Sequence, residues 1–392
     1  MNNSLKRLFM VLVCVVGMCG PMFAQRDSIR FSLLTCQPGM EIYSLFGHTA
    51  IRCQNYTKGT DWVFNYGVFS FSTPNFVYRF VKGETDYQLG VIPFKYFEGE
   101  YFMRGSSVYG QELNLTQHEK ETLLARLIDN YKPAHRTYRY NYFYDNCTTR
   151  ARDQIEAAIS GKVVYEAGMT QKSFRSMIHE YTSASLWSEF GIDFCLGAEA
   201  DRPIAYREQM FAPFYMKDYA SKAFICDVKG KKRPLVLKEE VVVAAHQHES
   251  DDIPVSPMMA ATLFLIVNVV VAYLRVNKLR IYWGWDVLIY GLQGIAGCVV
   301  AFLFFFSIHP TVGSNWLVLL FNPLPLFILP YLIYIGVKKR KTKYYLYKMV
   351  YLTLFICAIP FSPQNINITI LPLAFGLLVN SASHALVYRK QQ

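Results

Sequence analysis

The sequence predicts an α+β domain on the outside of a cell membrane, followed by an all-α bundle of five transmembrane helices. The chain has 392 residues, of which 52% are hydrophobic and only 18% charged, which is too apolar for one ordinary water-soluble domain. Polar residues alternate with aromatic ones up to about Ser256, and the composition then becomes strongly apolar. The N-terminus has the layout of an export signal. This composition excludes a disordered chain, a coiled coil and a small disulfide-rich scaffold.

The first 24 residues are expected to be a signal peptide. Two basic residues, Lys6 and Arg7, precede a run of apolar residues, and small or mixed residues follow. We expect cleavage near Gln25, although Met22 stands where a small residue is preferred. The exported domain would then comprise residues 25–256.

Residues 257–392 contain five apolar segments that approach or exceed the roughly 20 residues needed to span a bilayer. They are residues 257–274, 286–308, 316–337, 344–361 and 366–388. The third segment contains Pro323, Pro325 and Pro330, so we expect a kinked, broken or re-entrant helix. Such a break would either shape a groove for lipid access or only serve packing.

Basic residues in the loops set the orientation of these segments. Lys and Arg follow the first, third and fifth segments, and the two other loops carry none. By the positive-inside rule, residues 25–256 face the exterior and the C-terminus is cytoplasmic. The net charge of +11 is therefore attributed to membrane topology, and no nucleic-acid partner is expected. No acidic or basic residue is expected mid-span apart from Asp286 at a margin, which disfavours a transporter or channel.

The exported domain shows alternating strands and helices. Strands are predicted at residues 48–53, 61–71, 87–93, 107–115 and 138–144, and a hairpin at 223–245. Thr116 and Glu119 form a capping box that predicts a helix ending before Pro133. A second helix is predicted to begin beside Cys147, after an Asn or Asp cap.

Cysteine counting singles out one position. The exported domain contains an odd number of cysteines, namely Cys36, Cys53, Cys147, Cys195 and Cys226. One thiol must therefore stay unpaired within a monomer. Cys147 is the candidate, because the positive end of a helix dipole lowers the pKa of a thiol. The other four either form disulfides, for example Cys36 with Cys53 and Cys195 with Cys226, or stay reduced and buried.

A thiolate nucleophile works with an imidazole that takes up and returns a proton. His48 follows a glycine at the start of a predicted strand, where small and polar neighbours leave its ring accessible. His246 and His248 form an H-x-H pair, which is interpreted as part of a solvated linker rather than a metal site. No metal or cofactor is expected.

Five segments together resemble a known family. They are LFGHTAIR, FNYGVFSF, GETDYQL, LNLT and YRYNYFYDNCTTRARD. They resemble the extracytoplasmic domain of the Lnb-type lipoprotein N-acyltransferases, which is related to the circularly permuted papain-like group of NlpC-like peptidases and lecithin:retinol acyltransferase. In that group the catalytic His precedes the Cys, which is the order of His48 and Cys147 here. The resemblance covers roughly residues 30–215 and implies a permuted papain-like (NlpC/LRAT-like) fold.

The resemblance implies a bacterial inner-membrane enzyme with its catalytic domain in the periplasm. The acyl donor would be a membrane phospholipid, and the acceptor the α-amino group of a diacylglyceryl-modified lipoprotein cysteine. Cys147 would carry the acyl group as a thioester, and His48 would act as base and then acid. A cofactor is not needed, because the phospholipid ester already carries the free energy for amide formation. The alternatives are a membrane-tethered papain-like hydrolase (cell-wall peptidase or phospholipase), a transporter and a non-catalytic scaffold.

The resemblance also implies supporting residues. Papain-like sites orient the imidazole with a polar residue, for which Asn65 is the first choice and Tyr43 and Tyr66 are the alternatives. Asn65 would equally serve to satisfy a strand edge. Tyr43 and Tyr66 are also candidates for substrate contact.

Two further residues lie beside the nucleophile. The backbone N–H of Cys147 and the Asn146 side chain would stabilise an oxyanion, although Asn146 is an equally good helix cap. Arg150 would attract a phosphate head group, although a surface role is favoured. The aromatic residues of 73–87 and 98–105 would either rest on the bilayer surface or, as we favour for most of them, fill the core.

Overall fold

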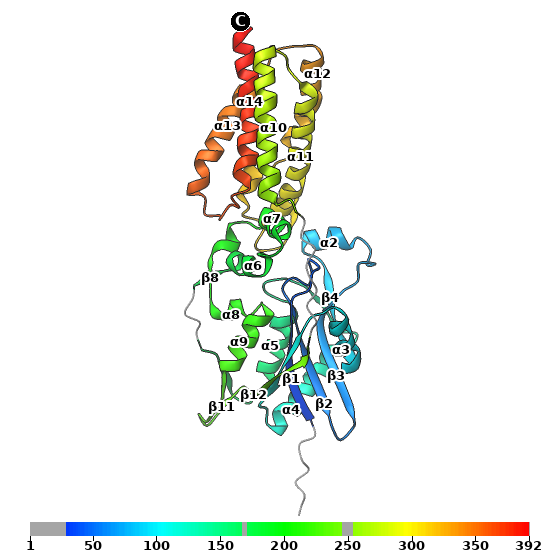
Figure 1. The fold of residues 1–392 in the computed structure, drawn as a ribbon. Helices are drawn as coiled ribbons and strands as arrows, with labels where there is room; N and C mark the ends of the chain where they lie inside the picture. Colours follow the sequence, from blue (N-terminus) through cyan, green and yellow to red (C-terminus); the bar gives the residue numbers. More distant parts are fainter. Residues whose placement is uncertain (1–28, 167–170, 245–253, 392) are drawn as a thin grey trace, which may run out of the picture.

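The computed structural model describes residues 29–166, 171–244 and 254–391. Figure 1 shows a sheet-containing domain at one end and a bundle of long helices at the other, with the C-terminus at the far end of the bundle. The expected signal peptide and the pair His246 and His248 lie outside the described residues.

The domain is built on a seven-stranded sheet in which all neighbouring strands are antiparallel, in the order β12-β5-β1-β2-β3-β4-β6. The strands are β1 (Ile29–Cys36), β2 (His48–Asn55), β3 (Thr60–Val68), β4 (Asp86–Pro93), β5 (Val108–Leu113), β6 (Thr137–Arg139) and β12 (Val236–Val243). The strands predicted at 48–53, 87–93 and 107–115 are confirmed, and the one predicted at 61–71 ends earlier, at Val68.

Helices cover both faces of this sheet. In β1, Phe31 and Leu33 face one core and Leu34 faces the other, as the two-residue period of a strand requires. The first core packs under α4 (Gln117–Tyr131) and α5 (Cys147–Ala158), with α9 (Pro213–Lys222) beside them, and the second under α3 (Phe94–Met103). The predicted capping box at the start of α4 is present, because Thr116 and Glu119 cap each other's backbone N–H groups.

The strand predicted at 138–144 is wrong beyond β6, which ends at Arg139. The Asn141 side chain accepts the N–H groups of Phe143 and Tyr144, each at 3.2 Å, and so closes a turn directly before α5. This local hydrogen bonding outweighs the strand preference of the aromatic residues.

The predicted hairpin at 223–245 is present but shorter. It consists of β10 (Phe224–Cys226) and β11 (Lys232–Pro234), which form a small sheet with β7 (Lys162–Val164). The chain then leaves this sheet, and β12 joins the edge of the main sheet beside β5. The remaining short elements are α2 (Phe76–Lys82), β8 (Lys172–Ser173), η1 (Ala198–Asp201), β9 (Pro203–Ile204) and α8 (Tyr206–Gln209).

The bundle contains five segments that are long and apolar enough to cross a membrane. They are α10 (Pro257–Lys278), α11 (Trp283–Phe306), η2 with α12 (Trp316–Leu319 and Leu324–Val337), α13 (Tyr344–Ala358) with η3 (Ile359–Phe361), and α14 (Ile370–Lys390). The predicted break in the third segment is confirmed between η2 and α12. Gln293 of α11 donates to the Leu320 carbonyl in this break at 2.7 Å. A Cβ at Gly297 would lie 2.2 Å from the backbone of Asn322, so the helix and the break approach closely only because that residue is glycine.

The expectation that only Asp286 brings charge into the spans is wrong. Helix α10 continues past residue 274, and Arg275 is fully buried, with an ion pair of 3.0 Å to Asp286. His384 contacts the same carboxylate at 2.9 Å, and Lys348 donates to Gln293 at 2.9 Å. These groups lie near the helix ends that point away from the exported domain, and they tie α10, α11, α13 and α14 together.

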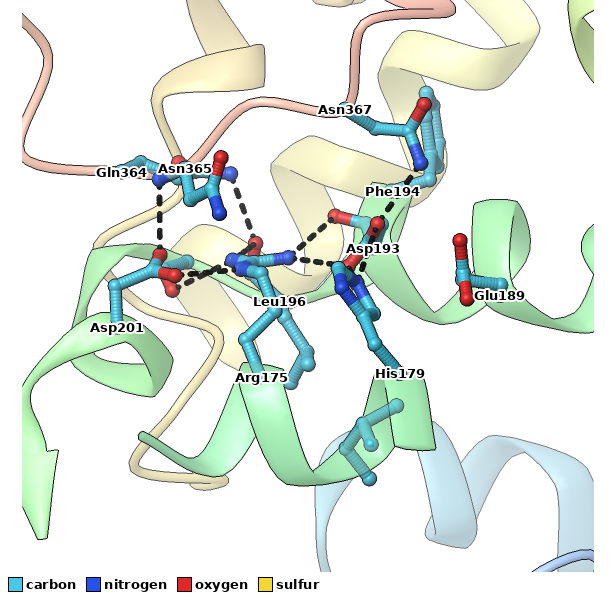
Figure 2. Close-up of polar contacts among 12 residues, drawn as sticks. Arg175, His179, Glu189, Asp193, Phe194, Leu196, Asp201, Gln364, Asn365 and Asn367 are labelled. Carbon is cyan, nitrogen blue, oxygen red and sulfur yellow. Dashed lines mark hydrogen bonds and ion pairs between the residues drawn. The ribbon is translucent and has the colours of Figure 1, made fainter. Parts of the chain in front are cut away.

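A second polar cluster joins the domain to the bundle (Figure 2). It is centred on Arg175 of α6 (Phe174–Thr182), which is 1% exposed and forms ion pairs with Asp193 at 2.7 Å and Asp201 at 2.8 Å. Asp193 belongs to α7 (Leu186–Cys195) and accepts from Asn367, in the loop before α14, at 2.9 Å. The backbone N–H of Asn365 donates to Asp201. We call these residues the junction cluster.

We predict that Arg175→Met destabilises the protein by roughly 3–5 kcal/mol, because it removes the buried cation shared by Asp193 and Asp201 and leaves Asp201 without it. Lys132→Met is the matched control, because the ion pair of Lys132 with Asp129 is about half exposed, and its loss should leave the stability nearly unchanged. Chemical denaturation of the full chain in detergent measures both changes. Equal small effects of the two substitutions would contradict this assignment.

Candidate active site

The chain turns sharply into β2 immediately before His48. Gly47 has φ of +75°, and a Cβ there would lie 2.5 Å from the carbonyl oxygen of Cys36. Only glycine meets both conditions without strain. The turn places His48 at the first position of β2, opposite Cys36 at the last position of β1.

Cys147 is the first residue of α5, as predicted. The Asn146 side-chain oxygen caps the helix by accepting the N–H groups of Thr148 and Thr149, both at 2.9 Å. The two amide hydrogens of Asn146 are donated to the carbonyls of Tyr142 and Phe211. Asn146 is therefore a helix cap, as one of the two interpretations expected. Its side-chain amide hydrogens are already used, so the prediction that they stabilise an oxyanion does not agree with these contacts. The backbone N–H of Cys147 has no partner within the part of the chain that the structure describes.

A pair of threonines fixes the start of α5 against β2. The hydroxyls of Thr49 and Thr148 are hydrogen-bonded at 3.0 Å, and both side chains are completely buried. Because each threonine directly follows a predicted site residue, this contact brings the two residues side by side. The Cys147 thiol and the His48 imidazole lie close enough for each to shift the pKa of the other.

Asn65 holds the other side of the imidazole. Its side-chain oxygen, on β3 next to β2, accepts a hydrogen bond from Nε2 of His48 at 2.5 Å. Nδ1 is then the ring nitrogen left for the sulfur. Cys147, His48 and Asn65 are all partly exposed, so solvent or a substrate can reach them.

Two residues after Asn65, Gly67 has φ of +93°. A Cβ at this position would lie 3.6 Å from Cβ of Cys147 and 3.9 Å from Cε1 of His48. The backbone of β3 therefore passes directly beside the cysteine and histidine pair. Its left-handed conformation favours glycine.

The electrostatics favour the charged forms of both groups. Burial alone would raise the pKa of the Cys147 thiol, but the charge and hydrogen bond of His48, with hydrogen bonds from the Thr49 backbone and Thr148, lower it overall. Burial would lower the pKa of His48, but the Cys147 thiolate and the hydrogen bonds to Cys147 and Asn65 raise it. The thiolate and the imidazolium thus stabilise each other.

The other predicted site residues lie elsewhere. Tyr66 is buried and donates to Asn130, so it does not orient the imidazole. Tyr43 is 53% exposed in the loop before β2 and contacts aromatic rings. Arg150 forms a two-pronged ion pair with Asp145, at 2.6 and 2.7 Å, which agrees with the favoured structural role and leaves its charge balanced.

Sequence reasoning missed Thr49, Thr148 and Gly67. Thr49 and Thr148 each directly follow a predicted catalytic residue, but only the packing of α5 on β2 shows that their hydroxyls meet. A glycine inside a predicted strand was the available signal for Gly67, since it often marks a close backbone approach.

The described cysteines are all free thiols. The suggested disulfides Cys36–Cys53 and Cys195–Cys226 are therefore absent. These four cysteines are reduced, as the alternative interpretation expected. In the register of β1 and β2, Cys36 faces His48 while Cys53 faces Phe31, so these two cysteines lie at different points along the strands. Burial raises the pKa of Cys53 to about 12 and that of Cys195 to about 11, opposite to the shift at Cys147.

One group of three potential metal ligands occurs among the described residues. His179, Glu189 and Asp193 have ligand atoms within 4.8 Å of one another. Asp193, however, already accepts from His179, Arg175 and Asn367, and the guanidinium of Arg175 balances its charge. We therefore assign His179 and Asp193 to the junction cluster (Figure 2).

Comparison with family models identifies both parts of the chain. Residues 23–183 match the model of the Lnb N-terminal periplasmic domain, and residues 247–392 match that of the Lnb transmembrane domain. The chain belongs to the Lnb family. No curated protein and no solved structure matches it. Lnb membership and the five apolar helices together identify a multi-pass membrane protein with a periplasmic domain, and they indicate a membrane enzyme of lipoprotein processing.

We predict that iodoacetamide alkylates Cys147 at pH values below the usual range of a thiol, because its pKa is lowered and the thiolate persists until the pH falls through that lowered value. In His48→Ala the cation is lost and burial dominates, so the profile should move to higher pH. At neutral pH the rate should then fall about tenfold for each unit of pKa increase. Peptide mass spectrometry measures the rates.

His135→Ala is the matched control, because this exposed histidine pairs with Asp129 and not with a cysteine. Cys195, with its raised pKa, serves as a slow internal reference. An unchanged profile in His48→Ala would show that the imidazole does not activate the sulfur.

Proposed function

We propose that this protein is a lipoprotein N-acyltransferase of the bacterial inner membrane, with a permuted papain-like catalytic domain. The observation that carries the proposal is the arrangement of Cys147, His48 and Asn65, in which a helix-start thiolate contacts an imidazole held by an amide. His48 precedes Cys147 along the chain, which is the order in the permuted group.

The first half of the proposed reaction forms a thioester. The Cys147 thiolate attacks the carbonyl carbon of a phospholipid ester, and the ester C–O bond breaks. The His48 imidazolium gives its proton to the departing alkoxide, which leaves as a lysophospholipid. The backbone N–H of Cys147 is the donor we assign to the oxyanion, because it lies at the nucleophile and has no partner among the described residues.

The second half transfers the acyl group. The α-amino group of the lipoprotein's modified cysteine attacks the thioester carbonyl, neutral His48 takes the proton from nitrogen, and the C–S bond breaks. The products are an amide, the Cys147 thiolate and the imidazolium, so the site returns to its initial state. Asn65 acts as a positioning residue by accepting the Nε2 proton of His48 in both halves.

The position of the site relative to the bundle supports a membrane lipid as donor. His48 lies where β1 ends, β2 begins and β3 ends, which is at one end of these three neighbouring strands. After β3 the chain continues from this end of the strands into α2, and the last residues of α2 contact the end of α11. Ser307 donates to the Val81 carbonyl at 2.8 Å, and the Ile308 N–H to the Lys82 carbonyl at 2.9 Å.

We predict that Cys147→Ala abolishes N-acylation of lipoproteins in cells, and that His48→Ala lowers its rate by at least about 100-fold, because general acid–base catalysis is lost. Mass spectrometry of lipoprotein N-termini measures the modification. Cys226→Ser is the control, because that partly exposed cysteine lies on β10, outside the site, and should leave N-acylation unchanged.

Two results would count against the transferase. Persistent N-acylation in Cys147→Ala would exclude the proposed chemistry. Cys147-dependent release of free fatty acid or of cleaved cell-wall peptide, with unmodified lipoprotein amines, would identify a tethered hydrolase instead.

A further inference from the structure

A connected group of aromatic side chains, partly exposed and joined through the buried Phe76, extends from the end of β3 toward the bundle. We call it the aromatic strip and define it as Tyr43, Phe69, Phe71, Phe76 and Phe80. The ring of Phe69 lies 5.0 Å from Phe71, 5.5 Å from Phe76 and 6.0 Å from Tyr43. Phe76 continues the strip to Phe80 at 6.2 Å. Phe71 is 66% exposed and Tyr43 53%, which is unusual for rings that touch one another.

One end of the strip reaches the nucleophile. Phe69 follows Gly67 by two residues, and the Gly67 backbone passes directly beside Cys147 and His48. Phe69 and Cys147 both pack against the first core of the domain. The strip therefore begins where the reacting ester would lie.

The other end reaches the bundle. The ring of Phe80 lies 6.2 Å from His309, and that of Tyr78 lies 5.9 Å from Phe302. Phe302 precedes the last residue of α11 by four positions, which corresponds to about 6 Å along the helix. The strip thus ends at the depth where a membrane-spanning helix meets the bilayer boundary.

The basic residues of α2 beside the strip are paired with carboxylates, one of which, Asp86, also pairs with Arg139 at 3.1 Å. On α2, Arg79 pairs with Asp86 at 2.6 Å and Lys82 with Glu84 at 2.7 Å. Both cations of α2 thus have a carboxylate partner, and the exposed rings beside them offer apolar contact area. Its chemistry suits a hydrocarbon chain rather than a head group.

We propose that the aromatic strip binds an acyl chain of the donor phospholipid and carries it from the periplasmic side of the bilayer to Cys147. The inference rests on the proposed function and adds the path and the residues of the donor site. Tyr43 and Phe71 contact the chain, and the boundary with α11 is its entrance.

The test compares two acyl donors on the full chain in detergent micelles. One is the long-chain lipid dioleoylphosphatidylethanolamine, and the other is monomeric dihexanoylphosphatidylcholine, whose short chains need little apolar contact. Intact-protein mass spectrometry measures the rate at which Cys147 gains an acyl group. In Phe71→Ser and Tyr43→Ser we expect the rate with the long-chain donor to fall about tenfold or more, and the rate with the short-chain donor to change less than about twofold.

Tyr96→Ser is the matched control, because Tyr96 is 68% exposed on α3, at the opposite face of the sheet, and should react normally with both donors. Equal losses with both donors, or no loss with either, would overturn the inference while the proposed function stands. If the unmodified protein acylates Cys147 with neither donor, the proposed function fails and the inference falls with it.

Discussion

The site depends on one contact, between the first turn of α5 and the first residues of β2. The hydrogen bond between the buried hydroxyls of Thr49 and Thr148 fixes this contact and sets the sulfur beside the imidazole. The Asn146 cap fixes the start of the helix, and the Gly47 turn fixes the start of the strand. Cys147 is thus held by the start of α5 and His48 by the start of β2. An activated nucleophile requires such rigid positioning.

The electrostatic balance at the site follows from the same contact. Burial opposes ionisation of either group alone, and their mutual attraction, with the hydrogen bonds from Thr49, Thr148 and Asn65, reverses it. Removing either partner therefore changes the state of the other. This coupling distinguishes Cys147 from Cys53 and Cys195, which meet a similar burial without a cation and have raised pKa values.

Local signals predicted much of this structure from the sequence. The capping box of Thr116 with Glu119 and the cap beside Cys147 are short-range hydrogen bonds, and both helices begin where expected. The strand expected at 138–144 was wrong because the turn-forming side chain of Asn141 decides the backbone there. The pairing of Thr49 with Thr148 joins residues 99 positions apart, so no local pattern encodes it.

The spans illustrate the same limit. Hydropathy located all five segments, and the prolines of the third segment located its break, because both features depend on local composition. It did not locate Arg275 inside the bundle, because a buried arginine is tolerated only through partners on other helices, such as Asp286. Arg275 follows the predicted end of the first span, so its sequence position indicates a loop. In the structure it belongs to α10 and is buried against Asp286.

The hydrogen bonds between domain and bundle limit what can move in the proposed reaction. The junction cluster holds α6 and α7 against the loop before α14, and the end of α2 holds the other side against α11. These contacts hold the domain on the bundle, so in the proposed reaction the lipid has to reach the sulfur. A chain leaving the bilayer for water loses about 0.8 kcal/mol per CH₂ group, so even a few exposed groups would slow the reaction strongly. Aromatic contact along the path offsets this loss. In the proposed reaction the acyl chain stays on the strip after thioester formation while the lysophospholipid departs, and the space that the lysophospholipid leaves beside Cys147 is then open to the lipoprotein amine.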